Sequence, residues 1–115
     1  MTIKEYMYNL RKQIREGDYS PDAREKLAYA RAYMRGEEAV DRLRDRWIEA
    51  EIRKKYGTDG AETRIVCNML KEPNNAKYLA EFEEHETYVE ECKAKVDELM
   101  QTLNDDLAIT LFNEE

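Results

Sequence analysis

Two runs of mainly apolar residues recur at alternating spacings of three and four, and each run predicts a long helix. The first run has eight positions, seven of which can pack as apolar bodies: Tyr78, Phe82, His85, Val89, Cys92, Val96, Leu99 and Leu103. The second follows the same rhythm: Tyr29, Tyr33, Gly36, Val40, Leu43, Trp47 and Ala50. At 1.5 Å per residue the two stripes are about 38 Å and about 32 Å long. Their similar lengths predict an antiparallel helical hairpin.

Start and stop signals place two helices in the first half of the chain. Thr2 and Glu5 form a capping-box pattern and Gly17 is a natural stop, so residues 1–17 are expected to form an N-terminal helix. A Ser-Pro-Asp sequence then starts a long helix over residues 20–56. Gly36 interrupts that helix, and a break there is the alternative. We expect a continuous helix in which the missing side chain allows close approach of a neighbouring backbone.

The second half is predicted to contain a short helix over 59–72, capped by Thr58 or Asp59 and packed through Ile65, Val66, Met69 and Leu70. Asn75 then caps a long helix over 75–103. Residues 104–115 are an apolar and then acidic tail. Its three polar residues Asn104-Asp105-Asp106 either break the helix or lie within a helix that continues through Leu107 and Leu111.

These segments predict one domain of class all-α, a helical bundle of four to five helices built around the long antiparallel hairpin. A second apolar stripe on the segment 20–56 consists of Ala23, Leu27, Ala30 and Met34. It points about 100° away from Tyr29 and Tyr33. We therefore expect two neighbours for this segment, one of them the N-terminal helix and the other a second copy of the chain in a homodimer.

The charge pattern narrows the class of partner. The net charge is −7, and it is uneven: residues 1–60 hold 14 Lys and Arg against 12 Asp and Glu, whereas residues 61–115 hold 5 against 14. Free nucleic acid and anionic membranes are not expected ligands, because both need clustered positive charge. The basic stretches 42–46 and 53–55 are interleaved with acids and predict helix-surface ion pairs. A partner protein with a basic surface fits the acidic half.

The sequence contains no catalytic or cofactor motif, so we expect neither an enzyme nor a bound cofactor. His85 lies in a run of glutamates, but the Glu-x-x-His pattern of di-metal bundles fails at Phe82, and no metal site is predicted. We expect His85 to fill a polar niche in the helix seam. Cys67 and Cys92 are expected to be buried reduced thiols. With no apolar run at the start and no stretch of about 20 apolar residues, we expect a cytoplasmic protein.

The leading hypothesis is a non-enzymatic protein–protein interaction module, an adaptor or inhibitor that docks a helical face on a partner. Its size, charge and lack of motifs resemble the small accessory and counter-defence proteins of bacterial viruses, and a narrower version is an acidic nucleic-acid mimic of that kind. The predicted partner-binding residues combine tyrosines with a large apolar body and carboxylates: Tyr6, Tyr8, Tyr88, Glu83, Glu84, Glu90 and Glu91. The alternative is a structural homo-oligomer, such as a viral assembly or scaffold component.

Overall fold

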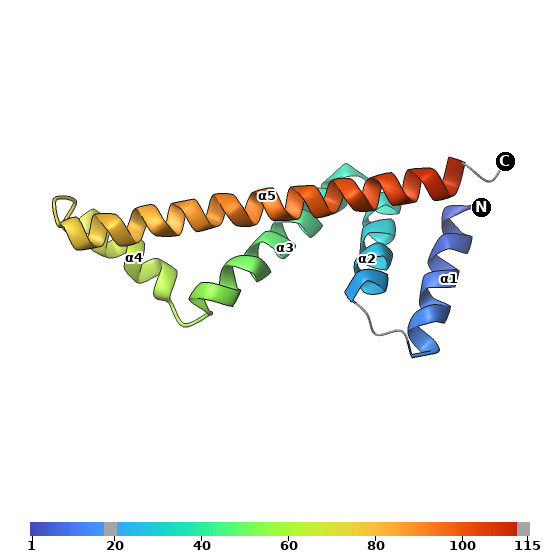
Figure 1. Cartoon of the computed structure of the whole chain (residues 1–115), viewed down its shortest axis with the longest axis horizontal. Helices are drawn as coiled ribbons and strands as arrows, with labels where there is room; N and C mark the ends of the chain where they lie inside the picture. The colour runs from blue at the N-terminus through green and yellow to red at the C-terminus, as the bar shows by residue number, and fades with distance from the viewer. Residues whose placement is uncertain (18–20, 113–115) are drawn as a thin grey trace. The chain divides into compact units, whose positions relative to one another are not determined.

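The computed structural model describes residues 1–17 and 21–112, which form five helices and no strand (Figure 1). The helices are α1 (Ile3–Arg15), α2 (Pro21–Arg35), α3 (Glu37–Tyr56), α4 (Ala61–Lys71) and α5 (Ala76–Phe112). The all-α prediction is confirmed. Ser20, the predicted cap of the second helix, lies outside the described residues.

Two predicted helix caps are confirmed and one is wrong. The Thr2 hydroxyl accepts a hydrogen bond from the Glu5 backbone N–H at 3.2 Å, which caps α1. The Asn75 side chain accepts from the N–H groups of Lys77 and Tyr78 at 3.0 and 3.2 Å, which caps α5. The N-cap of α4 is Gly60, which has no side chain to accept such a bond, rather than Thr58 or Asp59.

The expected continuity of the helix through Gly36 is also wrong. Gly36 has a φ of +113°, so α2 ends at Arg35 and α3 begins at Glu37. The packing reason predicted for this glycine is absent as well, because no heavy atom lies within 4 Å of the place that a Cβ would occupy. Gly36 is therefore required by its backbone angle, which side-chain-bearing residues rarely adopt.

The predicted tail over residues 104–115 is helical as far as Phe112, because α5 continues through the three polar residues at 104–106. Their side chains form hydrogen bonds to side chains instead of capping a helix end. Asn104 accepts from the Tyr29 hydroxyl at 2.9 Å, Asp105 from the Gln101 amide at 2.9 Å and Asp106 from the Tyr6 hydroxyl at 2.8 Å. With no competing local cap, the helix propagates past these residues.

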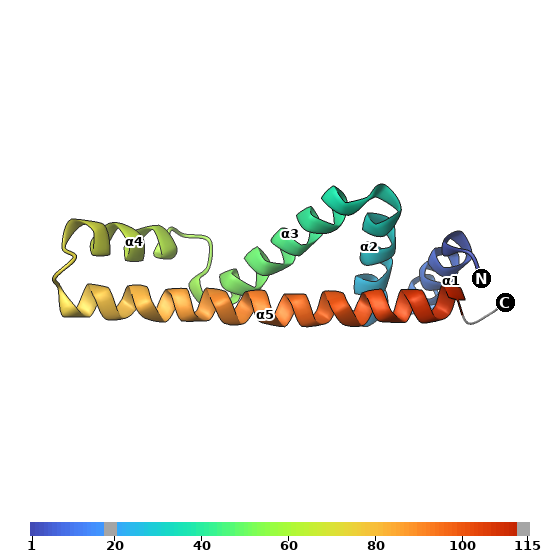
Figure 2. The ribbon, with the colours of Figure 1, turned by 90° about the horizontal axis from the view of Figure 1, so that it is seen from above.

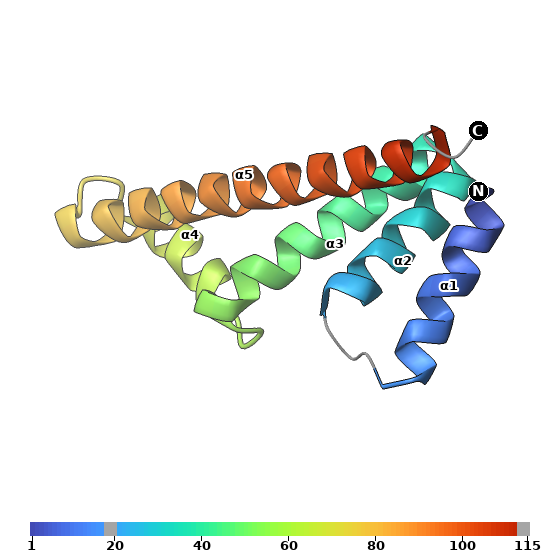
Figure 3. The ribbon, with the colours of Figure 1, turned by 45° about the vertical axis from the view of Figure 1, so that its right-hand side comes forward.

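The chain divides into two compact units, one made of Met1–Asp45 with Asp97–Glu115 and the other of Arg46–Val96. We call them unit 1 and unit 2. The single-domain prediction is not tested by this division and stays a prediction. In unit 1, α1 and α2 lie side by side (Figure 3). The buried side chains of this unit come from four helices: Tyr6, Met7, Leu10, Ala23, Leu27, Tyr29, Ala30, Ala32, Leu43, Met100, Leu103 and Leu107.

The face predicted to meet a second copy is mostly covered inside unit 1. Ala23 is 4% exposed, Leu27 7% and Ala30 0%, and only Met34 remains half exposed at 49%. This face is therefore used within the chain, as the pairing of α1 with α2 requires. The homodimer itself stays a prediction, but three of its four named residues are already buried.

In unit 2, α3 and α5 run antiparallel, as the two apolar stripes predict. Tyr88 donates to the backbone carbonyl of Glu51 at 3.1 Å, and one turn further along α3 Lys55 contacts Glu84 at 2.9 Å. Ile48, Ile52, Cys92 and Val96 are the buried apolar residues of this unit. The short helix α4 lies alongside the first turns of α5 (Figure 2), yet none of its residues is buried. The predicted inward packing of Leu70 is wrong, because this side chain is 68% exposed.

Hydropathy along the five helices bears on the membrane prediction. Among the described residues, no helix combines the length and the apolar character that crossing a bilayer would require.

Candidate functional site

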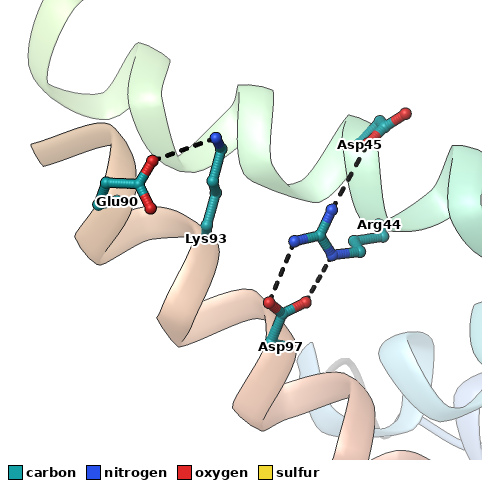
Figure 4. A network of polar contacts seen from close by, with 5 residues as sticks. All are labelled: Arg44, Asp45, Glu90, Lys93 and Asp97. Carbon is teal, nitrogen blue, oxygen red and sulfur yellow. Dashed lines mark hydrogen bonds and ion pairs between the residues drawn. The ribbon is translucent and has the colours of Figure 1, made fainter. Parts of the chain in front are cut away.

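The four glutamates predicted to bind a partner all lie exposed on α5 in unit 2. At 100° per residue they point away from the core-facing positions His85, Cys92 and Val96. Two of them are engaged within the chain. Glu84 pairs with Lys55 at 2.9 Å, and Glu90 pairs with Lys93 at 3.3 Å, as Figure 4 shows for the second pair.

The Lys55 ammonium lowers the pKa of Glu84 through their hydrogen bond, so this carboxylate is firmly ionised and neutralised by its partner. Lys55 is also held in place by aromatic faces, with its Nζ 4.9 Å from the Tyr88 ring centre and 5.5 Å from that of Tyr56. Part of the acidity predicted for α5 is therefore compensated internally.

Three exposed carboxylates on this stretch of α5 have no such compensation. Glu83, Glu86 and Glu91 form no ion pair within the described residues. We call these three the open carboxylates. Glu86 is not one of the seven predicted partner-binding residues, but it belongs to the glutamate-rich run that supplies the charge in the nucleic-acid-mimic hypothesis.

The three predicted tyrosines differ in their exposure and contacts. Tyr6 is only 7% exposed and donates its hydroxyl to Asp106 at 2.8 Å; burial, and then this bond, raises its pKa. Tyr88 is half-buried and its ring packs edge-on against Tyr56 with centres 5.7 Å apart. Tyr8 is 57% exposed. Of the three, Tyr8 is the exposed one, whereas Tyr6 and Tyr88 take part in the packing of their own units.

His85 lies in the seam of unit 2, where the sequence predicts a polar niche. Its Nε2 is 2.8 Å from Oε1 of Glu62, and its ring meets Tyr56 edge-on with centres 4.9 Å apart. Its Nδ1 is buried and has no hydrogen-bond partner in the described part of the chain. No group of three His, Cys, Asp or Glu side chains able to hold a metal ion occurs among the residues described. These contacts fit a packing role for His85.

The two cysteines are free thiols, as expected, but they differ in burial. Cys92 is buried in unit 2, whereas Cys67 on α4 is exposed, so the prediction that both are buried is wrong for Cys67. The difference arises because Cys67 lies on α4, and no residue of this helix is buried.

A pocket that the sequence analysis did not predict lies at the corner between α2 and α3 in unit 1. Its volume is about 360 Å³, and its lining residues are Tyr29, Tyr33, Gly36, Glu37, Val40 and Asp41. Four of these six belong to the apolar stripe identified from the sequence. The pocket was missed because a continuous helix through Gly36 has no corner. The clue in the sequence was Gly36 itself, since a glycine can adopt the positive φ that turns the chain.

The walls of this corner pocket are aromatic on α2 and acidic on α3. Tyr29 is buried and donates to Asn104, while Tyr33 is 50% exposed, with its ring centre 6.5 Å from that of Tyr29. Glu37 and Asp41 are exposed and form no ion pair within the described residues. Aromatic faces and carboxylates both attract cations.

Comparisons with protein-family models, with curated proteins and with solved structures all give no match for this chain.

Proposed function

We propose that this chain is a non-enzymatic protein–protein interaction module, an adaptor or inhibitor that docks the outward face of α5 on a partner with a basic surface. The observation that carries the proposal is the set of open carboxylates, Glu83, Glu86 and Glu91, which are exposed and have no cation against them in the described structure. Carboxylates left without internal partners are available to the lysines and arginines of another protein.

The charge density along α5 supports a narrower form of the proposal, a nucleic-acid mimic of the kind used in viral counter-defence. Six glutamates lie between residues 81 and 91, a length of about 15 Å at the helical rise. Glu84 and Glu90 are paired, so four glutamates remain: Glu81 and the three open carboxylates. They give about one charge per 4 Å, similar to the charge spacing of about 3.4 Å along one nucleic-acid strand. A protein that binds nucleic acid would present a suitable basic surface to such a helix.

The test compares two variants with the same change in net charge. The first, Glu83→Lys with Glu86→Lys and Glu91→Lys, reverses the open carboxylates. The control, Glu16→Lys with Asp59→Lys and Glu72→Lys, reverses three exposed acids outside α5. Each tagged protein is used to capture partners from lysate of the native host at about 100 mM and about 500 mM salt, since exposed charge pairs weaken as salt rises. Helicity by circular dichroism confirms that each variant is folded.

A partner captured at low salt by the wild type and the control, and lost by the α5 variant, is the expected result. Equal capture by the α5 variant contradicts the proposal. For the mimic, duplex DNA added to the purified pair should displace the chain from its partner. A partner that holds both ligands at once contradicts mimicry while leaving the interaction module in place.

A second candidate function is a structural homo-oligomer, and the exposure of α4 favours it. This helix buries none of its residues, and two apolar side chains of unit 2, Leu70 and Leu79, are 68% and 40% exposed. A symmetry mate is one way to cover them. Light scattering of the wild type should then give a mass above 13.7 kDa that falls on Leu70→Lys. Ile109 in unit 1, an apolar side chain that is 59% exposed, supplies the control, Ile109→Lys.

A further inference from the structure

We propose that the corner pocket between α2 and α3 binds a guanidinium group, the side chain of an arginine on a partner protein. The pocket belongs to unit 1 and the open carboxylates to unit 2, so the two sites are formed by different residues. The inference rests on the proposed function in one respect, namely that the partner is a protein rich in basic side chains.

The pocket exists because the chain turns at Gly36. Gly36 donates its N–H to the carbonyls of Ala32 and Tyr33 at 3.1 and 3.3 Å, which closes α2, and its own carbonyl accepts from Val40 at 3.2 Å, which opens α3. In one straight helix the tyrosines and the acids would lie along a single axis, with no corner between them. The turn instead places Tyr29 and Tyr33 of α2 and Glu37 and Asp41 of α3 along one hollow of about 360 Å³.

The charges around this hollow favour a cation. Glu37 and Asp41 are four residues apart on α3 and therefore lie on one face of it. The two arginines that follow Asp41 most closely on α3 are already engaged: Arg42 lies 3.8 Å from Glu38, and Arg44 contacts both oxygens of Asp97 at 2.5 and 3.0 Å (Figure 4). Asp41 does contribute to the field at Arg44, but Asp97 is the principal partner of that guanidinium.

The tyrosines distinguish a guanidinium from an ammonium ion. A guanidinium is planar and weakly hydrated, so it stacks on an aromatic face while its edge donates two hydrogen bonds to a carboxylate. A lysine ammonium is compact and strongly hydrated, and gains less from such a wall. Tyr33, half exposed and tilted by 33° from the ring of Tyr29, supplies an accessible face. The occupant that uses both walls is therefore an arginine side chain.

The test is an NMR titration of the full chain with N-acetyl-arginine methylamide. The neutral isostere N-acetyl-citrulline methylamide and the matching lysine compound serve as probe controls. We expect saturable shifts at Tyr33 and Val40 with the arginine compound, weaker ones with lysine and none with citrulline. Glu37→Gln with Asp41→Asn should weaken binding at least about fivefold. The control Asp59→Asn with Glu72→Gln neutralises two exposed acids outside the pocket that form no ion pair within the described residues, and should leave the affinity unchanged.

Equal shifts with citrulline, or an unchanged affinity in the Glu37/Asp41 variant, would overturn the proposal. Equal binding of the lysine compound would overturn the preference for a guanidinium. The triple α5 variant separates this inference from the proposed function. If it loses the partner but keeps the arginine titration, both stand. If partner capture does not depend on α5 while the titration persists, the pocket stands without the docking function.

Discussion

Single tyrosine hydroxyls show where prediction from sequence ends at the scale of a residue. The periodicity placed Tyr6 and Tyr29 on helices, and their position within amphipathic helices is confirmed. It does not reveal that their hydroxyls meet Asp106 and Asn104, because those partners lie 100 and 75 residues away in sequence. A tyrosine suits both a wet surface and a core with one polar partner, so residue type alone does not separate the two.

Tyr6→Phe should lower the free energy of unfolding by about 1 kcal/mol at neutral pH through the lost hydrogen bond. Burial raises the pKa of Tyr6 above its ordinary value, so the folded state holds this proton more tightly than the unfolded state does. The advantage of the wild type is therefore complete below about pH 10 and shrinks as pH rises further. Urea unfolding of both proteins between pH 8 and pH 11 measures the difference, in which the titration of other groups cancels. A gap that widens with pH would contradict this account.

The ion pair between Arg44 and Asp97 in unit 1 is a second residue-scale prediction. The guanidinium lowers the pKa of Asp97, so the contribution of the pair is present above about pH 4 and is lost as pH falls through the folded pKa. Both side chains are more than a third exposed, at 35% for Arg44 and 53% for Asp97, so solvent screens their attraction. A double-mutant cycle with Arg44→Ala and Asp97→Ala should give a coupling energy of about 0.5 kcal/mol at pH 7. A coupling unaffected by acid or by high salt would contradict the assignment.

At the scale of an element, helix ends governed by neighbouring residues are predictable and those governed by distant ones are not. The caps at Thr2 and Asn75 are local, and the sequence predicts both correctly. The continuation of α5 past Asn104 depends on tyrosines from α1 and α2, which occupy the polar side chains that would otherwise end a helix. Gly36 is ambiguous for another reason: a glycine on an apolar stripe permits both a close contact and a turn.

Gly36→Ala tests this turn through the sign of its effect. With φ at +113°, an alanine is strained, and the free energy of unfolding should fall by about 1–2 kcal/mol. If α2 and α3 formed one straight helix in solution, the same substitution would raise it by about 1 kcal/mol, because alanine is the better helix former. Urea unfolding followed by circular dichroism distinguishes the two. The arginine titration of the variant shows whether the corner pocket survives.

The last turns of α5 carry a second element-scale prediction. Leu107 is 2% exposed and belongs to the core of unit 1, whereas Ile109, two residues later, is 59% exposed. Leu107→Ala should cost about 2–5 kcal/mol of unfolding free energy. Ile109→Ala should cost less than about 0.5 kcal/mol. Similar small costs for both would mean that Leu107 does not pack in the core of unit 1.

At the scale of the whole molecule, the helical class and the antiparallel pairing of α3 with α5 follow from periodicity, and both are confirmed. The covering of Ala23, Leu27 and Ala30 within unit 1 does not follow from it. An apolar face on a helix predicts only that something packs on it, and its periodicity does not choose between α1 and a second copy. The corner pocket does not follow from periodicity either, because it depends on the backbone angle at Gly36.

The two candidate functions respond to salt in opposite directions, and this separates them for the molecule as a whole. Two copies that each carry a net charge of −7 repel one another, so self-association through apolar residues such as Leu70 should strengthen as salt screens the repulsion. Docking of the open carboxylates on a basic partner should weaken under the same change. Light scattering of the chain with and without its partner, from about 50 to about 500 mM salt, measures both trends. A mass that rises with salt together with a partner that is retained would favour the oligomer, and the reverse pair of trends would favour the interaction module.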